Sequence, residues 1–218
     1  MTASRREAQN DPARRARLKE LVGLHTRPVI ASVLDRPHLE AFIESSAQFC
    51  FLAQTDLIEL ETAIARIHDR PRKVVFVNID SIVGLAQDRG GVDYLARLGA
   101  DGLLTTRGSL IPRAQEAGLL TVQKLFITDR SNIQRGVAAV HGAKPDLLQL
   151  MPAPVLPFVA GHEIMRIRPV VASGFVTSPT EVEAALSHGA VAVSTSTPKL
   201  WEYEHASEQR TRPQPSRE

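Results

Sequence analysis

From Pro28 onward, short runs of β-branched and other apolar residues alternate with longer amphipathic stretches. Continuous apolar runs are typical of parallel strands buried on both faces, and the alternation is typical of repeated βα units. An open doubly wound sheet is one way to arrange such units, but eight of them favour closure into a barrel. The expected strands cover residues 29–33, 49–53, 74–79, 102–105, 121–127, 147–151, 170–172 and 190–193.

The stretches between the runs predict short helices. The clearest begins after Ser178, because Pro179 suits the first helical position and Glu181 completes a capping box. All eight units must fit between residues 28 and 203, which is small for a barrel of this kind. The pattern therefore predicts an α/β fold, a compact (β/α)8 TIM-like barrel with short helices, whose last helix, at residues 199–203, is truncated.

The two ends of the chain differ from the predicted barrel, residues 28–203. Residues 1–27 carry seven basic and three acidic side chains. A solvated basic N-terminal extension is the favoured interpretation of this segment, and a contact with nucleic acid is the alternative. Residues 204–218 contain too few apolar side chains to fold, so we expect a disordered tail.

Composition limits the class of protein. The chain is 43% hydrophobic and 23% charged, with a formal net charge of +2, as in an ordinary globular domain. No apolar stretch is long enough to cross a bilayer and the first residues lack a secretory signal, so we expect a cytoplasmic protein with no membrane partner. The single cysteine, Cys50, forms no internal disulfide and is expected to be a buried thiol.

Hydroxyl and glycine residues follow the last two predicted strands. In a β/α barrel the loops after strands seven and eight often bind phosphate through backbone N–H groups. Ser173 and Gly174 end strand seven, and Ser194, Thr195 and Ser196 end strand eight, just before Pro198 starts a helical turn. Serine and threonine also cap helices, which is the ordinary alternative. Taken as a pair, the two loops predict a phosphate site.

Other polar side chains are expected at the same mouth. Asp80 and Arg107 follow strands three and four, and Lys124 and Gln149 lie within strands five and six. Asp80 and Lys124 suit an acid and base pair, a salt bridge or a ligand contact, and the binding role is favoured. Gln149 is an amide and cannot act as a base. The seven histidines show no ligand spacing, so we expect no metal and no cofactor.

Several segments resemble the glycerol-3-phosphate-responsive antiterminator family, the regulators of glycerol uptake operons. The resemblance extends from about residue 28 to 203 and rests on the order of its blocks. These are residues 77–85 (VNIDSIVGL), 102–107 (GLLTTR), 122–129 (VQKLFITD), 144–146 (KPD) and 192–196 (AVSTS), followed by Lys199, Leu200 and Trp201. Two positions depart from the family pattern: Ser173 stands where a glycine pair is usual, and Gln149 stands in a stretch that usually contains a glutamate.

The resemblance implies a barrel without catalytic turnover that senses glycerol 3-phosphate and acts on a leader mRNA. It places the ligand phosphate at Gly174 and at Ser194, Thr195 and Ser196, with Asp80, Arg107 and Lys124 lining the mouth. The sequence does not identify the RNA surface. The basic candidates outside the mouth are Arg14, Arg15, Arg17, Arg113 and Arg135.

Two other functions stay open from the residues alone. One is an enzyme, an isomerase or lyase of a small phosphorylated metabolite, with Asp80 as base and Lys124 as acid or imine former. The other is a sensor whose output is a protein partner. The sequence also leaves open whether the chain forms a homo-oligomer.

Overall fold

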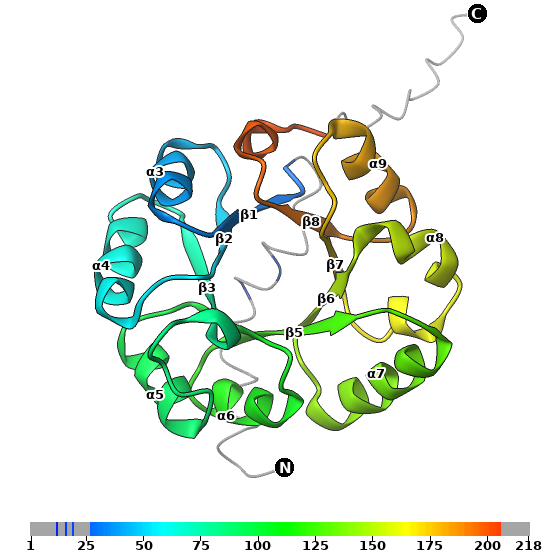
Figure 1. Cartoon of the computed structure of the whole chain (residues 1–218), viewed down its shortest axis with the longest axis horizontal. Coiled ribbons are helices and arrows are strands. Elements are labelled where there is room, and N and C mark those ends of the chain that lie inside the picture. Colours follow the sequence, from blue (N-terminus) through cyan, green and yellow to red (C-terminus); the bar gives the residue numbers. More distant parts are fainter. Residues whose placement is uncertain (1–11, 13–15, 17–18, 20–26, 206–218) are drawn as a thin grey trace, which may run out of the picture.

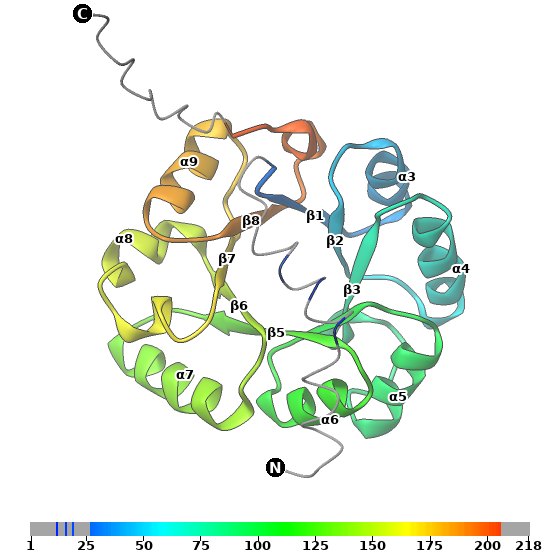
Figure 2. The ribbon, with the colours of Figure 1, turned by 180° about the vertical axis from the view of Figure 1, so that it is seen from behind.

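The chain folds into a closed barrel of eight parallel strands in sequential order, β1 to β8. The computed structural model describes Pro12, Ala16, Lys19 and residues 27–205. Viewed down the barrel, the strands surround the centre and the helices form an outer ring (Figures 1 and 2). The strands are β1 (Val29–Val33), β2 (Phe49–Leu52), β3 (Val74–Asn78), β4 (Gly102–Thr105), β5 (Leu120–Phe126), β6 (Leu147–Met151), β7 (Val170–Ser173) and β8 (Ala192–Thr195).

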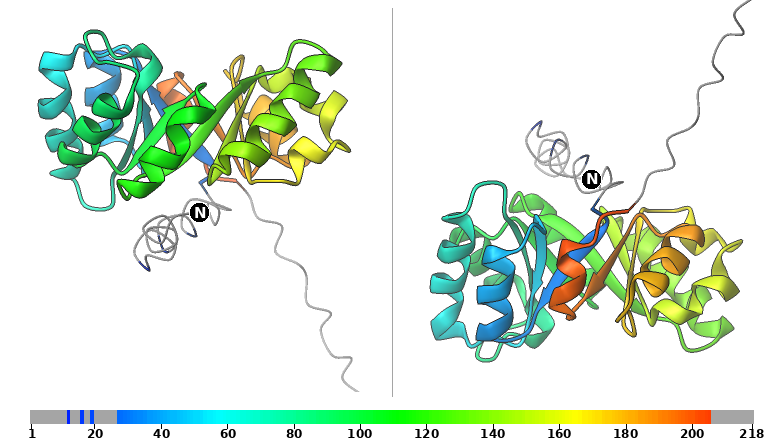
Figure 3. Two further views of the ribbon diagram at one scale, coloured as in Figure 1. Left: turned by 90° about the horizontal axis from the view of Figure 1, so that it is seen from below. Right: turned by 90° about the horizontal axis from the view of Figure 1, so that it is seen from above.

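The connections between strands are short helices that lie outside the barrel, as the side views show (Figure 3). The α-helices are α3 (Arg36–Glu44), α4 (Leu57–His68), α5 (Arg89–Arg97), α6 (Ile111–Glu116), α7 (Arg130–Ala143), α8 (Leu156–Val159) and α9 (Pro179–Ser187). The 3-10 turns are η1 (Ile79–Ser81), η2 (Gly108–Leu110), η3 (Ala153–Val155), η4 (Glu163–Met165) and η5 (Pro198–Glu202). The predicted truncated last helix is η5, a short 3-10 turn.

The interior of the barrel is filled by large side chains. Phe51 of β2 and Phe76 of β3 meet edge to face, with ring centroids 5.7 Å apart. On the neighbouring β4, a Cβ at Gly102 would come within 2.2 Å of the Phe76 ring. Glycine at this position therefore makes room for the phenylalanine, and the inner layer closes without a pore.

A second apolar layer joins the strands to the helices. It includes Phe42 of α3, Leu60 of α4 and Trp201 of η5, all of which are buried. Trp201 packs edge-on against Phe42, and its indole N–H donates to the Thr195 carbonyl at 2.9 Å. The last turn of the chain is thereby attached both to the first helix and to the end of β8.

Two aspartates, Asp101 and the partly buried Asp146, stabilise the end of the barrel where the strands begin. Asp101 accepts a hydrogen bond from the Val75 N–H at 2.9 Å, and Asp146 accepts one from the Thr121 N–H at 2.8 Å. Each carboxylate thus pairs a backbone donor at the start of the neighbouring strand. Residues at this end of a β/α barrel usually serve stability, whereas those at the opposite end serve function.

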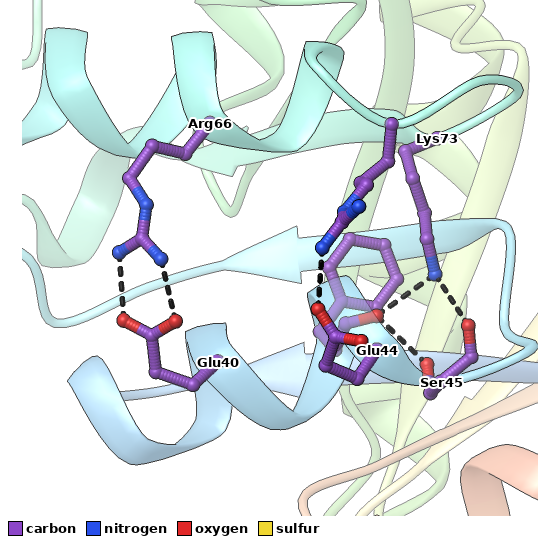
Figure 4. Close-up of polar contacts among 7 residues, drawn as sticks. Glu40, Glu44, Ser45, Arg66 and Lys73 are labelled. Atoms are coloured by element: carbon purple, nitrogen blue, oxygen red, sulfur yellow. Dashed lines mark hydrogen bonds and ion pairs between the residues drawn. The ribbon is translucent and has the colours of Figure 1, made fainter.

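Lys73, just before β3, joins the end of α3 to the barrel. Its ammonium group donates to the carbonyls of Phe42, Ser45 and Ala47 at 2.6–2.8 Å and lies 4.3 Å from the centre of the Phe42 ring. Burial lowers the pKa of Lys73. Figure 4 shows this contact beside two ion pairs that join α3 to α4 and to the turn after it. One of them joins Arg66 to Glu40.

The predicted strands are confirmed to within one residue at each end, except for a larger shift at the last strand. The capping box is present, because Ser178 and Glu181 each accept from the other's backbone N–H. The prediction for strand eight, residues 190–193, was wrong by two residues. Ser194 and Thr195 belong to the strand because they pair with Ile30 and Ala31 of β1, so the polar side chains extend the ladder that the apolar run alone did not define.

Residues 1–11, 13–15, 17–18, 20–26 and 206–218 lie outside the described residues. The interpretations of most of the basic extension and of the tail, and the RNA candidates Arg14, Arg15 and Arg17, fall on these segments.

The cap of α7 predicts an acid-dependent loss of stability. Asp129 accepts from the Ser131 hydroxyl, the Asn132 N–H and the Thr128 hydroxyl, and these hydrogen bonds lower its pKa from 3.8 to about 2. A lowered carboxyl pKa stabilises the fold above the unfolded pKa, and the contribution is lost as the pH falls through the folded value. We expect Asp129→Ala to be less stable than the wild type at neutral pH and the difference to shrink between pH 3.8 and about 2. Urea unfolding across this range measures it, and a gap that does not change with pH would contradict the assignment.

Candidate functional site

A cavity of about 230 Å³ opens at the end of the barrel where the strands finish. Its apolar floor includes Phe51 and Leu104, which belong to the inner barrel layer. Its polar lining comes from five strands, the turn after β2 and the turn η1, and its members are Ser32, Gln54, Asn78, Ser81, Lys124, Gln149 and Ser173. The sequence predicted Lys124, Gln149 and Ser173 here. It missed Ser32, although this residue lies two positions after the inward-facing Ile30 and therefore shares its side of the strand.

Three predicted site residues form one hydrogen-bonded chain at the wall of this cavity. The Ser173 and Ser194 hydroxyl oxygens lie 2.7 Å apart, and the Gln149 side-chain amide donates to the Ser194 hydroxyl at 3.1 Å. All three side chains are buried. Their strands β6, β7 and β8 are neighbours in the barrel, which brings residues from distant positions in the chain into contact.

Two buried oxygen atoms at this mouth lack a partner among the described residues. They are Asn78 Oδ1 and Gln149 Oε1. Burying a polar atom without a hydrogen bond costs about 1–3 kcal/mol, so such atoms usually find a partner. Because both residues line the cavity, a ligand or water that donates hydrogen bonds fits this position.

Lys124 supplies a positive charge to the same cavity. Within residues 27–205, its ammonium group has no hydrogen bond or ion pair. Burial lowers the pKa of Lys124, and the negative charge of Asp80 opposes this effect in part. A half-buried ammonium group without a protein partner is well suited to bind an anion.

The carboxylate of Asp80 holds the end of β4 through hydrogen bonds. It accepts from the Thr105 hydroxyl at 2.7 Å and from the Thr106 N–H at 2.6 Å. The Thr105 hydroxyl oxygen also accepts from the Arg107 N–H at 3.0 Å. Asp80 is therefore close enough to influence Lys124 electrostatically, but it is not among the residues that line the cavity.

The β7 loop, residues 173–176, turns sharply beside the cavity. Gly174 has a φ of +82°, a conformation that side-chain-bearing residues rarely adopt. A Cβ at Gly174 would lie 3.3 Å from the Met151 methyl group, and Met151 lines the cavity. The glycine therefore permits both the turn and a close approach of the backbone to whatever occupies the mouth.

The β8 loop, residues 194–197, presents its side chains in different directions. Ser194 points towards Ser173 and Gln149. Thr195 does not share this direction, because its hydroxyl donates to the Val176 carbonyl at 2.5 Å and accepts from the Thr197 N–H at 3.1 Å. The Thr195 side chain thus joins the β7 and β8 loops, while Ser196 is exposed.

The arginines predicted for the mouth and for RNA contact differ in whether their side chains already have a partner. Arg107 is exposed at the start of η2, is not among the cavity-lining residues, and has no ion pair among the residues described. Arg113, a candidate for RNA contact, is paired with Asp93 at 2.5 Å and also contacts Glu116, so its guanidinium group is occupied. Arg135 of α7 is exposed.

A larger groove of about 480 Å³ lies between α3 and α4, but three of its four charged side chains, Asp35, Arg36 and Arg66, are already paired. Arg66 forms a bidentate contact with Glu40, which also faces Arg36. Unpaired buried groups therefore distinguish the barrel mouth from this groove better than size does. Among the described residues, no three His, Cys, Asp or Glu side chains come together as a metal site.

The model of the family described as "Glycerol-3-phosphate responsive antiterminator" matches residues 29–201, which include every strand of the barrel. The chain belongs to the glycerol-3-phosphate responsive antiterminator family. The resemblance inferred from the sequence blocks is thereby confirmed.

This antiterminator family member is similar to three known proteins over most of their length. It is 27% identical over 180 residues to the uncharacterized protein YgcP of Escherichia coli, covering 82% of this chain and 93% of that one. The glycerol uptake operon antiterminator regulatory protein from Listeria monocytogenes is 27% identical with a TM-score of 0.76, covering 81% and 95% of the two chains. A glycerol uptake operon antiterminator-related protein from Thermotoga maritima is 27% identical with a TM-score of 0.72, covering 81% and 99%.

More distant structures share the barrel alone. A solved aldolase is 13% identical with a TM-score of 0.63, which shows the fold and carries no statement about chemistry. Within the described part of the antiterminator family member, no helix has the length and apolar character needed to cross a bilayer.

Proposed function

We propose that this protein is a non-enzymatic regulator that binds glycerol 3-phosphate in the barrel mouth and, when loaded, acts on the leader mRNA of glycerol utilisation genes. The observation that carries the proposal is the combination of an unpaired ammonium group, Lys124, with two unpartnered buried oxygens, Asn78 Oδ1 and Gln149 Oε1, in one cavity beside Gly174. Membership of the family supports this choice of ligand.

The ligand fits this arrangement in one orientation. Its phosphate group would lie at the β7 and β8 loops, near Gly174 and Ser196. Lys124 would neutralise part of the phosphate charge, and the glycerol hydroxyls would donate to Asn78 and Gln149. Each group that is unpartnered in the free protein would then gain a partner, which is the usual condition for selective binding of a small polar molecule.

For the ligand to control RNA binding, it must bind two conformations of the protein with different affinity. If glycerol 3-phosphate strengthens RNA binding by a given factor, RNA must strengthen ligand binding by the same factor. A gel-shift titration of a glycerol-operon leader transcript, with and without glycerol 3-phosphate, tests this coupling. We expect the ligand to tighten binding about tenfold or more. Equal, weak binding under both conditions would overturn the regulatory output.

An enzyme of a small phosphorylated metabolite is the second candidate, because burial lowers the pKa of Lys124, the direction that favours the neutral amine a nucleophile requires. Against it, the Asp80 carboxylate is held by Thr105 and Thr106 rather than aimed into the cavity. A sensor with a protein partner is distinguished from one with an RNA partner by repeating a pull-down after ribonuclease treatment.

Replacement of Lys124 by methionine tests the ligand site directly. We expect glycerol 3-phosphate to bind about 10- to 100-fold more weakly, since a hydrogen bond to a charged group contributes about 1.5–3 kcal/mol. Isothermal titration calorimetry measures the change. Lys144→Met is the matched control, because Lys144 is exposed at the end of α7, far from the mouth. Unchanged affinity in Lys124→Met would exclude Lys124 from the site.

A further inference from the structure

His38 of α3 reaches across the seam of the barrel to the β8 loop. Its Nδ1 atom lies 2.6 Å from Asp35 Oδ1, and its Nε2 atom lies 3.0 Å from the Ser196 carbonyl oxygen. The ring also packs against Trp201 of η5, with centroids 5.9 Å apart. The first βα unit thereby holds the loop that follows the last strand.

The two partners of this ring are both hydrogen-bond acceptors. A backbone carbonyl oxygen can only accept a hydrogen bond, so Nε2 must carry a proton. The backbone N–H and the ring of His38 lower the pKa of Asp35, so its carboxylate is ionised at neutral pH and also only accepts. Both contacts are therefore hydrogen bonds only when both ring nitrogens carry a proton. In a neutral ring, one nitrogen would direct a lone pair at an oxygen.

The other charged groups near His38 are engaged elsewhere or exposed. On its own helix, Arg36 faces Glu40, and Glu40 is held by Arg66 of the adjacent α4. On η5, Glu202 accepts from the Ser46 N–H and Lys199 is exposed. Strand β1, which also packs on α3, has no titratable side chain. Within residues 27–205, Asp35 is the charged group in contact with the His38 ring.

The contact fixes one peptide group of the β8 loop from both sides. His38 holds the Ser196 carbonyl, and the Thr195 hydroxyl accepts from the N–H of the same peptide unit, at Thr197. The plane of this peptide determines how the adjoining backbone faces the mouth. In its doubly protonated form, the ring would also place a positive charge behind a loop that the proposed function assigns to the ligand phosphate.

We infer that His38 is a positioning residue for the phosphate-binding β8 loop, and that its protonation makes ligand affinity depend on pH. The inference rests on the proposed function, because it requires an anion at that loop. Loss of the proton replaces one hydrogen bond by repulsion, releases the Ser196 peptide and removes a charge that favours the anion. Affinity for glycerol 3-phosphate should therefore fall as His38 deprotonates.

Calorimetric titration of the full chain with glycerol 3-phosphate, from pH 5.5 to 8.5, tests the inference. His38→Gln is the informative variant, since its amide keeps one donor but does not titrate. The phosphate of the ligand also titrates, near pH 6, but equally for every variant. We expect the ratio of wild-type to His38→Gln affinity to fall about three- to tenfold across the histidine range. His141→Gln is the matched control, because His141 also pairs with a carboxylate, Glu163, but at the other end of the barrel.

The outcomes separate the two claims. Parallel pH profiles for the wild type and His38→Gln would overturn the role of His38 while leaving the ligand site intact. Absence of binding in the wild type at every pH would overturn the proposed function and this inference with it. A second measurement uses the wild type alone: by reciprocity, saturating glycerol 3-phosphate should move the titration of the His38 ring, followed by nitrogen NMR, to higher pH. An unmoved titration would contradict the inference.

Discussion

Gly174→Val is expected to abolish binding of glycerol 3-phosphate while the barrel stays folded. A β-branched residue at a φ of +82° is strained, at a cost of about 1–3 kcal/mol, which is less than the usual stability of a domain. Its side chain would also meet Met151, whose methyl group lies 3.3 Å from the position of the new Cβ, at the edge of the cavity. The backbone approach that the phosphate requires would be closed.

Calorimetry measures the loss of binding, and circular dichroism during heating checks the fold. Gly161→Val is the matched control, because a Cβ at Gly161 meets no atom within 4 Å. We expect this control to bind like the wild type. If Gly174→Val also binds with wild-type affinity, the phosphate does not lie at the β7 loop.

Lys73→Met is expected to lower the free energy of unfolding by about 3 kcal/mol. The methionine keeps most of the apolar stem, but the carbonyls of Ser45 and Ala47 lose a charged donor in a half-buried setting. The contact of the ammonium group with the Phe42 ring is lost as well.

Urea unfolding of the two proteins measures this difference. The adjacent ion pair between Arg70 and Glu44 offers the control, since both side chains are largely exposed and such pairs contribute about 0–1 kcal/mol. Arg70→Met should therefore change stability much less than Lys73→Met. Equal effects of the two substitutions would show that Lys73 acts as an ordinary surface charge.

The periodicity of apolar residues was sufficient to predict the architecture. Runs such as residues 102–105 and 147–151 coincide with β4 and β6, because strands buried on both faces leave continuous apolar stretches. The range predicted for the last strand ended two residues too early, because its final residues are the polar Ser194 and Thr195. Strand pairing with β1, which no local pattern encodes, decides where that strand ends.

The placement of the candidate residues on the strands could be predicted from the sequence, but most of their contacts could not. Alternation along a strand places Ser194 inside the barrel and Thr195 outside, and the structure agrees with that rule. The contact between Ser194 and Gln149 depends on the order of strands in the barrel. The role of His38 depends on contacts across 158 residues of sequence, which no spacing within α3 reveals.

The most direct test of the account is a calorimetric titration of the wild-type protein with glycerol 3-phosphate, beside glycerol and inorganic phosphate alone. Because the account assigns the phosphate to the β7 and β8 loops and the hydroxyls to Asn78 and Gln149, it predicts saturable binding at one site, tighter for glycerol 3-phosphate than for either part. Absence of binding at millimolar ligand, or binding no tighter than that of inorganic phosphate, would contradict it.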